Sequence, residues 1–152
     1  MKKIVVTIFV MFCCVFAYAQ QTETELIRSA FKLEKKALVA QFLALSNEDA
    51  AKFWPIYDKY ELERSEAGTR RIKLIDTYAT KYESMDDAST DALVKESASI
   101  QKKEVALREK YYATVKKSVS TNVAARFYQI EDAINVGVRM ELFSQIPMLN
   151  PK

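Results

Sequence analysis

The chain holds only two glycines in 152 residues, and this scarcity constrains its fold more than any other feature. Tight β-hairpins and phosphate-binding loops depend on glycine, because its backbone reaches conformations that other residues avoid. Apolar residues make up 49% of the chain and charged residues 28%, which is typical of a globular domain and unlike a disordered tail. The sequence therefore predicts an all-α fold.

The first 19 residues have the layout of a secretory signal. Lys2 and Lys3 form a basic start, residues 4–16 are uncharged and mostly apolar, and Ala17 and Ala19 are small residues where signal peptidase cuts. We expect cleavage after Ala19 and export to the periplasm.

Two alternatives to a cleaved signal are disfavoured. An uncleaved anchor is one, but the apolar run is shorter than the roughly 20 residues of a transmembrane helix. A lipid anchor is the other, but neither cysteine of the run follows a small residue. The expected organisation is a signal at residues 1–19, a single helical domain at 20–146 and a tail at 147–152.

Charge and residue types exclude several classes of function. Cleavage would leave 21 basic and 20 acidic residues and no cysteine, and the chain has no histidine. Disulfides, histidine-based catalysis and the usual zinc ligands are therefore missing, and no basic surplus indicates nucleic-acid binding. The adjacent acids at 86–87 and 131–132 would point to different faces of a helix. We expect no catalytic residue, no metal and no cofactor.

Apolar residues at three- and four-residue steps predict four helices, over residues 22–45, 47–82, about 90–117 and 121–146. The expected N-caps are Thr22, Ser46, Ser89 or Thr90, and Ser120. A helix of about 30 residues is roughly 45 Å long. Helices of this length are ill suited to a compact globule, and they favour a flat hairpin or an elongated bundle that forms a dimer.

Two details of these helices are testable against a structure. Pro55 lies inside the second helix, where its missing N–H predicts a bend near residues 51–55. The third helix has a near-heptad apolar seam that Gln101 and Arg108 interrupt. The seam residues are Val94, Ala98, Val105, Tyr112, Val115 and Val119.

An internal repeat is the strongest pattern in the chain. Residues 45–56 recur 74 residues later as residues 119–130. The identical pairs are Ser46/Ser120, Ala50/Ala124, Ala51/Ala125, Phe53/Phe127 and Ile56/Ile130, and the pairs matched in kind are Leu45/Val119, Lys52/Arg126 and Trp54/Tyr128. Each copy reads as an apolar helix end, a serine cap and a new helix with an aromatic residue. The alternative is that any two capped amphipathic helix starts look alike.

This arrangement resembles the LTXXQ family of small periplasmic stress proteins, the Spy and CpxP group. In the first copy Leu45 and Ser46 stand where the family has Leu and Thr, while Asp49 replaces Gln. The corresponding residues of the second copy are Val119, Ser120 and Val123. The match lies in layout more than in letters, so the chain looks like a divergent branch.

The resemblance implies a long bent helical hairpin that pairs into an antiparallel cradle. Family members hold unfolding clients on the concave face without ATP, or dock on a membrane sensor kinase and restrain it. The resemblance covers the expected mature chain from about residue 22 to residue 143.

A client-binding surface needs apolar area and charge for reversible capture. The candidate client- or partner-binding residues are Arg70, Arg71, Lys73, Lys102, Arg108, Tyr111 and Tyr112. The alternative for the basic residues is a solvated outer face of salt bridges. Arg108 differs from the rest because it interrupts the apolar seam, either at the seam's edge or facing a shared cavity.

A second set of residues is assigned to the repeat and to packing. These residues are Leu45, Ser46, Asp49, Phe53, Trp54, Pro55, Tyr57, Val119, Ser120, Phe127 and Ile130. The helical spacing of the aromatic residues near Phe53 indicates core or dimer packing.

The sequence thus favours a periplasmic, ATP-independent chaperone or envelope-stress accessory protein that binds unfolded or misfolded envelope proteins. A regulatory ligand of a membrane sensor kinase or anti-sigma factor is the alternative, and a structural bundle without clients is a third. All three use the same amphipathic scaffold, so the sequence does not choose between them.

Overall fold

The computed structural model describes residues 32–149, and the chain divides into two units, residues 1–41 and 42–152. The predicted signal, the cap at Thr22 and the last three residues of the tail lie outside the described residues. Residues 32–43 are helical. Helices α2, α3 and α4 all belong to the second unit.

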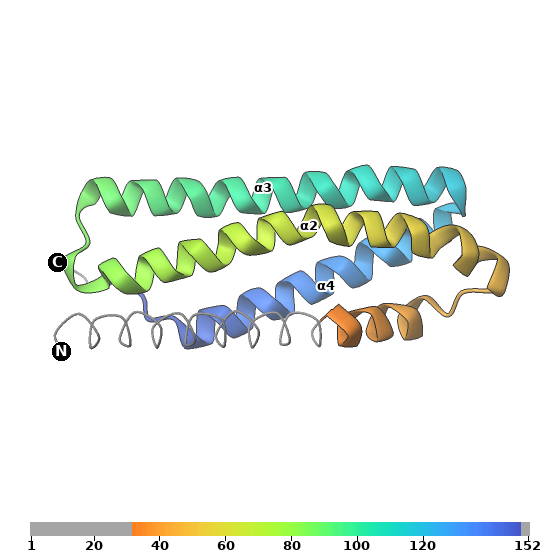
Figure 1. The fold of residues 1–152 in the computed structure, drawn as a ribbon, viewed down its shortest axis with the longest axis horizontal. Coiled ribbons are helices and arrows are strands. Elements are labelled where there is room, and N and C mark those ends of the chain that lie inside the picture. Colours follow the sequence, from red (N-terminus) through yellow and green to blue (C-terminus); the bar gives the residue numbers. More distant parts are fainter. Residues whose placement is uncertain (1–31, 150–152) are drawn as a thin grey trace, which may run out of the picture. The chain divides into compact units, whose positions relative to one another are not determined.

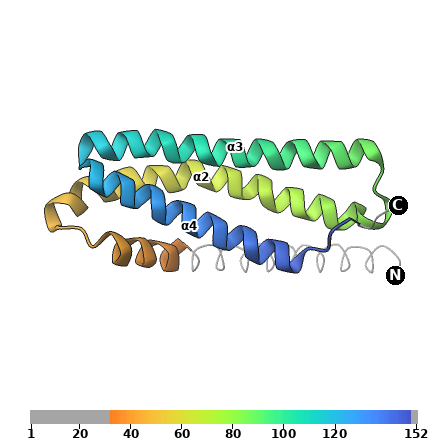
Figure 2. The ribbon, with the colours of Figure 1, turned by 180° about the vertical axis from the view of Figure 1, so that it is seen from behind.

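The second unit is built from three long helices. They are α2 (Asn47–Lys81), α3 (Asp87–Ser118) and α4 (Thr121–Gln145), with a short 3-10 turn, η1 (Tyr82–Ser84), after α2. Figures 1 and 2 show α2 and α3 as an antiparallel hairpin, with α4 returning in the direction of α2. Residues 32–149 contain no strand, so the all-α prediction is confirmed.

The two copies of the repeat begin α2 and α4 in the same way. The Ser46 Oγ accepts a hydrogen bond from the Asp49 N–H at 3.1 Å, and the Ser120 Oγ accepts one from the Val123 N–H at 3.2 Å. Each serine thereby satisfies a backbone donor that the first turn of a helix leaves unpaired. The predicted caps of both helices are confirmed.

The start of α3 differs from the prediction. Its N-cap is Asp86, whose carboxylate accepts a hydrogen bond from the Ser89 N–H at 2.7 Å. The helix therefore begins at Asp87, and the predicted caps Ser89 and Thr90 lie inside its first turn. Aspartate caps as well as serine does, and its charge also suits the positive end of the helix dipole.

The segment around the start of α2 departs from the prediction in one respect. The preceding helix ends at residue 43, two residues early, because Ala44 adopts a left-handed conformation with φ of 43°. Pro55 lies within α2, which is one unbroken helix from Asn47 to Lys81. The bend near residues 51–55 stays a prediction.

The predicted apolar seam of α3 is wrong in phase. Val94, Ala98 and Val105 are exposed, and of the six predicted residues only Val115 is buried. The residues of α3 that are buried are Ile100, Glu104, Leu107, Arg108, Tyr111 and Val115. They still follow three- and four-residue steps, but two of them are charged. A search for apolar residues alone therefore misses this face.

Both buried charges of α3 are tolerated because each has a partner on a neighbouring helix. The Arg71 guanidinium of α2 lies 2.6 Å from the Glu104 carboxylate, and the Arg108 guanidinium lies 3.0 Å from the Asp132 carboxylate of α4. A buried charge costs far less when it is paired and hydrogen-bonded. These pairs join α3 to both other helices.

Large rings fill the space between the first halves of α2 and α4, where the Cα atoms of the two helices stay more than 8 Å apart. We call this the aromatic core; it comprises Phe53, Tyr57, Tyr60, Tyr111 and Phe127. The ring centroids of Phe53 and Phe127, which are equivalent residues of the two repeat copies, are 6.0 Å apart. The two copies therefore pack against each other.

A buried carboxylate completes the aromatic core. Glu131 is 1% exposed, and it accepts hydrogen bonds from the Tyr57 hydroxyl at 3.1 Å and the Tyr60 hydroxyl at 2.8 Å. Burial, together with the nearby charge of Glu131, raises the pKa of Tyr57 and of Tyr60 well above the usual tyrosine value. Both tyrosines therefore remain neutral donors.

Candidate functional site

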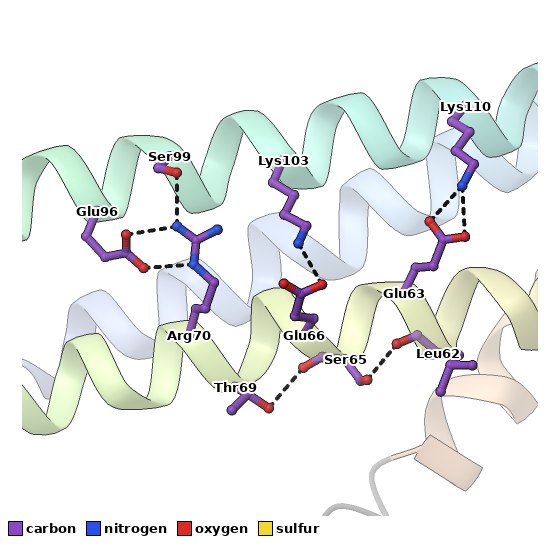
Figure 3. A network of polar contacts seen from close by, with 10 residues as sticks. All are labelled: Leu62, Glu63, Ser65, Glu66, Thr69, Arg70, Glu96, Ser99, Lys103 and Lys110. Carbon is purple, nitrogen blue, oxygen red and sulfur yellow. Dashed lines mark hydrogen bonds and ion pairs between the residues drawn. The ribbon is translucent and has the colours of Figure 1, made fainter.

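Ion pairs occupy much of the charged outer face between α2 and α3. Figure 3 shows that the Arg70 guanidinium binds both oxygens of Glu96, at 2.9 and 2.8 Å, and also the Ser99 hydroxyl at 3.0 Å. Two further pairs follow along the hairpin, Lys103 with Glu66 at 2.7 Å and Lys110 with Glu63 at 2.7 Å. Arg70 is thus already paired within the chain, which fits the alternative reading of this face as a solvated surface of salt bridges.

Two of the candidate binding residues lie in the interior. Arg108 is 6% exposed, and its guanidinium lies 5.6 Å from the centre of the Tyr128 ring. Tyr111 is 5% exposed, and its hydroxyl donates to the Glu63 carboxylate at 2.8 Å. Burial, followed by the hydrogen bond to Glu63, raises the pKa of Tyr111 to about 12. Both side chains hold α3 to its neighbours in this fold.

The remaining candidates are spread over the surface. Tyr112 is half-buried, with its ring 6.2 Å from that of Tyr128, and Lys102 is exposed and lines neither of the two cavities described below. Arg71, by contrast, faces one cavity and Lys73 the other. The seven candidates therefore do not form one site.

A basic hollow lies between the second half of α2 and the first half of α3, with a volume of about 600 Å³. Its lining residues are Arg70, Lys73, Leu74, Thr77, Lys81, Ala88, Ser89, Ala92, Leu93 and Glu96. Because Arg70 is paired with Glu96, Lys73 and Lys81 supply the surplus positive charge. The sequence predicted Arg70 and Lys73 here but not Lys81.

An apolar groove of about 470 Å³ lies among the second half of α2, the first half of α3 and the second half of α4. Its lining residues are Arg71, Leu74, Ile75 and Tyr78 of α2, Thr90, Leu93, Val94, Ser97, Ile100 and Gln101 of α3, Arg139, Leu142 and Phe143 of α4, and Met85, Ile146, Pro147, Met148 and Leu149 outside the helices. Leu74 and Leu93 line both the groove and the basic hollow. These two side chains therefore form a wall that the two cavities share.

The described part of the C-terminal tail forms one wall of the groove. The Tyr78 hydroxyl donates to the Pro147 carbonyl at 2.7 Å, and the Tyr82 hydroxyl donates to the Met148 carbonyl at 2.8 Å. These bonds tie residues 147–149 to α2 and η1. The tail thus takes part in the candidate site.

Two arginines are the charged residues of the groove lining. Arg71 is neutralised by Glu104, whereas Arg139 has no ion-pair partner among residues 32–149. Sequence reasoning missed Arg139 because it stands alone in an apolar stretch. Of the apolar residues near Arg139 on α4, Leu142 and Phe143 line the groove, whereas Val136 and Met140 do not. No apolar periodicity in the sequence therefore singles out Arg139.

The described residues give no indication of a metal centre or a membrane span. Within residues 32–149 no group of three His, Cys, Asp or Glu residues could hold a metal ion. None of the helices in this range combines the length and hydrophobicity that crossing a membrane requires.

Comparisons of the chain with protein-family models, with curated proteins and with solved structures find no match.

Proposed function

We propose that the chain works by binding, as an ATP-independent chaperone or stress accessory protein of the periplasm. The observation that carries this proposal is the apolar groove, which exposes large apolar side chains in a folded helical unit. Phe143 is 64% exposed and Val94 is 62% exposed, and both line the groove. Contiguous exposed apolar surface is characteristic of sites that bind proteins or apolar ligands.

The basic hollow supports capture of charged, partly unfolded segments. It shares Leu74 and Leu93 with the apolar groove, so apolar surface and the surplus charge of Lys73 and Lys81 lie close together. Complementary charge speeds encounter, and its effect weakens as salt screens it. Clients with apolar residues near acidic ones are therefore the preferred class.

The LTXXQ resemblance supports the same proposal. Both copies of the repeat begin a helix with a serine cap, and Phe53 and Phe127 pack together in the aromatic core. The repeat therefore has a structural role at one end of the unit. We assign client binding to the apolar groove at the other end of the unit.

The proposal is tested by light scattering of a denatured client protein, with the purified chain present, no ATP, and low or high salt. Phe143→Ser removes an apolar side chain of the groove. Met140→Ser is its matched control, because Met140 is on the same helix, is 66% exposed and does not line the groove. We expect the chain and the Met140 variant to suppress aggregation at near-stoichiometric ratios, and the Phe143 variant to suppress it several-fold less. Equal behaviour of the two variants, or no suppression, would contradict the proposal.

A regulatory ligand of a membrane sensor kinase or anti-sigma factor is the second candidate. The tethered tail favours it, since Tyr78 and Tyr82 give the groove one defined wall that could suit a single partner. In this case the chain would leave client aggregation unchanged. Crosslinking from position 143 in cells would then yield one membrane protein in stoichiometric amount.

A further inference from the structure

We infer that the apolar groove binds a free long-chain fatty acid, with its acyl chain along the groove and its carboxylate at Arg139. The inference deepens the proposed function and rests on it, because it uses the same groove. It adds a small-molecule ligand to the protein clients proposed above.

The size and lining of the groove suit a small amphiphile. Small-molecule sites are commonly about 300–1,000 Å³, mostly apolar, with a few polar groups that fix orientation. The groove has a volume of about 470 Å³, and its walls are mainly leucine, isoleucine, valine, methionine and aromatic side chains. It therefore matches a ligand with one long apolar part.

The few polar groups in the lining favour an acyl chain over a peptide backbone. A peptide brings an N–H and a C=O with every residue, and each costs free energy if it is buried without a partner. Besides the two arginines, the polar side chains of the lining are Tyr78, Thr90, Ser97 and Gln101, and the Tyr78 hydroxyl is already used by the tail. A client can place side chains at the rim, whereas an acyl chain can fill the interior.

The positive charge of the groove lining favours a ligand with a carboxylate head group. Among the described lining residues the charged ones are Arg71 and Arg139, with no aspartate or glutamate. Of these two cations, Arg71 is paired with Glu104 at 2.6 Å, whereas Arg139 has no ion-pair partner among residues 32–149. A guanidinium binds a carboxylate through two parallel hydrogen bonds. An amphiphile with a cationic head would be repelled.

The test is calorimetric titration of the purified chain with oleate below its micelle concentration, together with carboxyl-¹³C oleate followed by NMR. Methyl oleate, dodecyltrimethylammonium and vesicles of anionic phospholipid are the comparison ligands. Arg139→Gln removes the proposed head-group partner. Lys117→Gln is its control, because it removes one exposed positive charge near the end of α3 and does not line the groove.

We expect one oleate per chain, and we expect Arg139→Gln to weaken binding about tenfold while Lys117→Gln leaves it unchanged. Methyl oleate should bind about as weakly as oleate does to the Arg139 variant. Equal oleate affinity in both variants, tighter binding of the cationic amphiphile, or binding to vesicles alone would overturn the inference. Oleate binding without client protection would contradict only the chaperone proposal, and protection without oleate binding would contradict only the fatty-acid site.

Discussion

The two halves of the α2–α3–α4 unit share the same helices but fill the space between α2 and α4 differently. In the first half the aromatic core spans the gap, with Phe53 and Phe127 in ring contact and Glu131 held by two tyrosine hydroxyls. In the second half the side chains are mostly smaller, and Tyr78 bonds to the tail. Large rings thus close the space between α2 and α4 at one end, whereas the mostly smaller side chains at the other end line a groove.

The largest loss of stability should come from removing a ring of the aromatic core. Phe127→Ala deletes a side chain that is 1% exposed, and we expect it to lower the free energy of unfolding by about 3–5 kcal/mol. Phe143→Ala, in the groove, should lower it by less than about 0.5 kcal/mol, because that ring is already mostly in water. Urea denaturation of both variants measures the contrast. Similar losses would mean that the two halves are packed alike.

The second prediction uses the raised pKa of Tyr57 and Tyr60. Above pH 10 the unfolded chain loses protons from these hydroxyls, whereas the folded chain keeps them because burial and Glu131 raise their pKa. The unfolded state then binds fewer protons, so stability is complete below pH 10 and falls as pH rises, by about 1.4 kcal/mol per pH unit for each tyrosine.

Urea denaturation between pH 9 and pH 12 tests this dependence. The control is a variant with both Tyr57→Phe and Tyr60→Phe, which keeps the lysine titrations and lacks the two hydroxyls. Its stability should fall less steeply with pH than that of the unchanged chain. Equal slopes would show that the two hydroxyls are open to water in the folded state.

The sequence predicted the parts of the fold that depend on local signals. Ser46 and Ser120 each accept a hydrogen bond from an N–H three residues later, in the first turn of the helix that they cap. A short stretch of sequence is therefore enough to identify each cap. The repeat likewise placed Phe53 and Phe127 at equivalent positions. The seam of α3 failed because Glu104 and Arg108 are buried by partners on other helices, and no local pattern shows that pairing.

The candidate site could be predicted only in part, for a related reason. Arg71 and Lys73 were found as members of a basic cluster, yet they line different cavities because positions two apart on a helix point to different faces. The groove combines three helices with a tail that the sequence marks only by its prolines. Its walls are therefore a property of tertiary packing, which periodicity along one helix does not reveal.

The smallest predicted loss of stability comes from removing the serine caps of α2 and α4, which start the closely packed half. Ser120→Ala leaves the N–H of Val123 without its partner, and Val123 is 7% exposed, so water replaces the lost bond poorly. At Ser46 the bond to Asp49 is exposed, so water can take over. We expect a loss of about 1–2 kcal/mol for Ser120→Ala and about 0.5–1 kcal/mol for Ser46→Ala, both measured by urea denaturation. The matching threonine variants should restore most of each loss, since threonine also caps. A larger loss at Ser46 would contradict the argument that burial of the capped N–H sets the size of the loss.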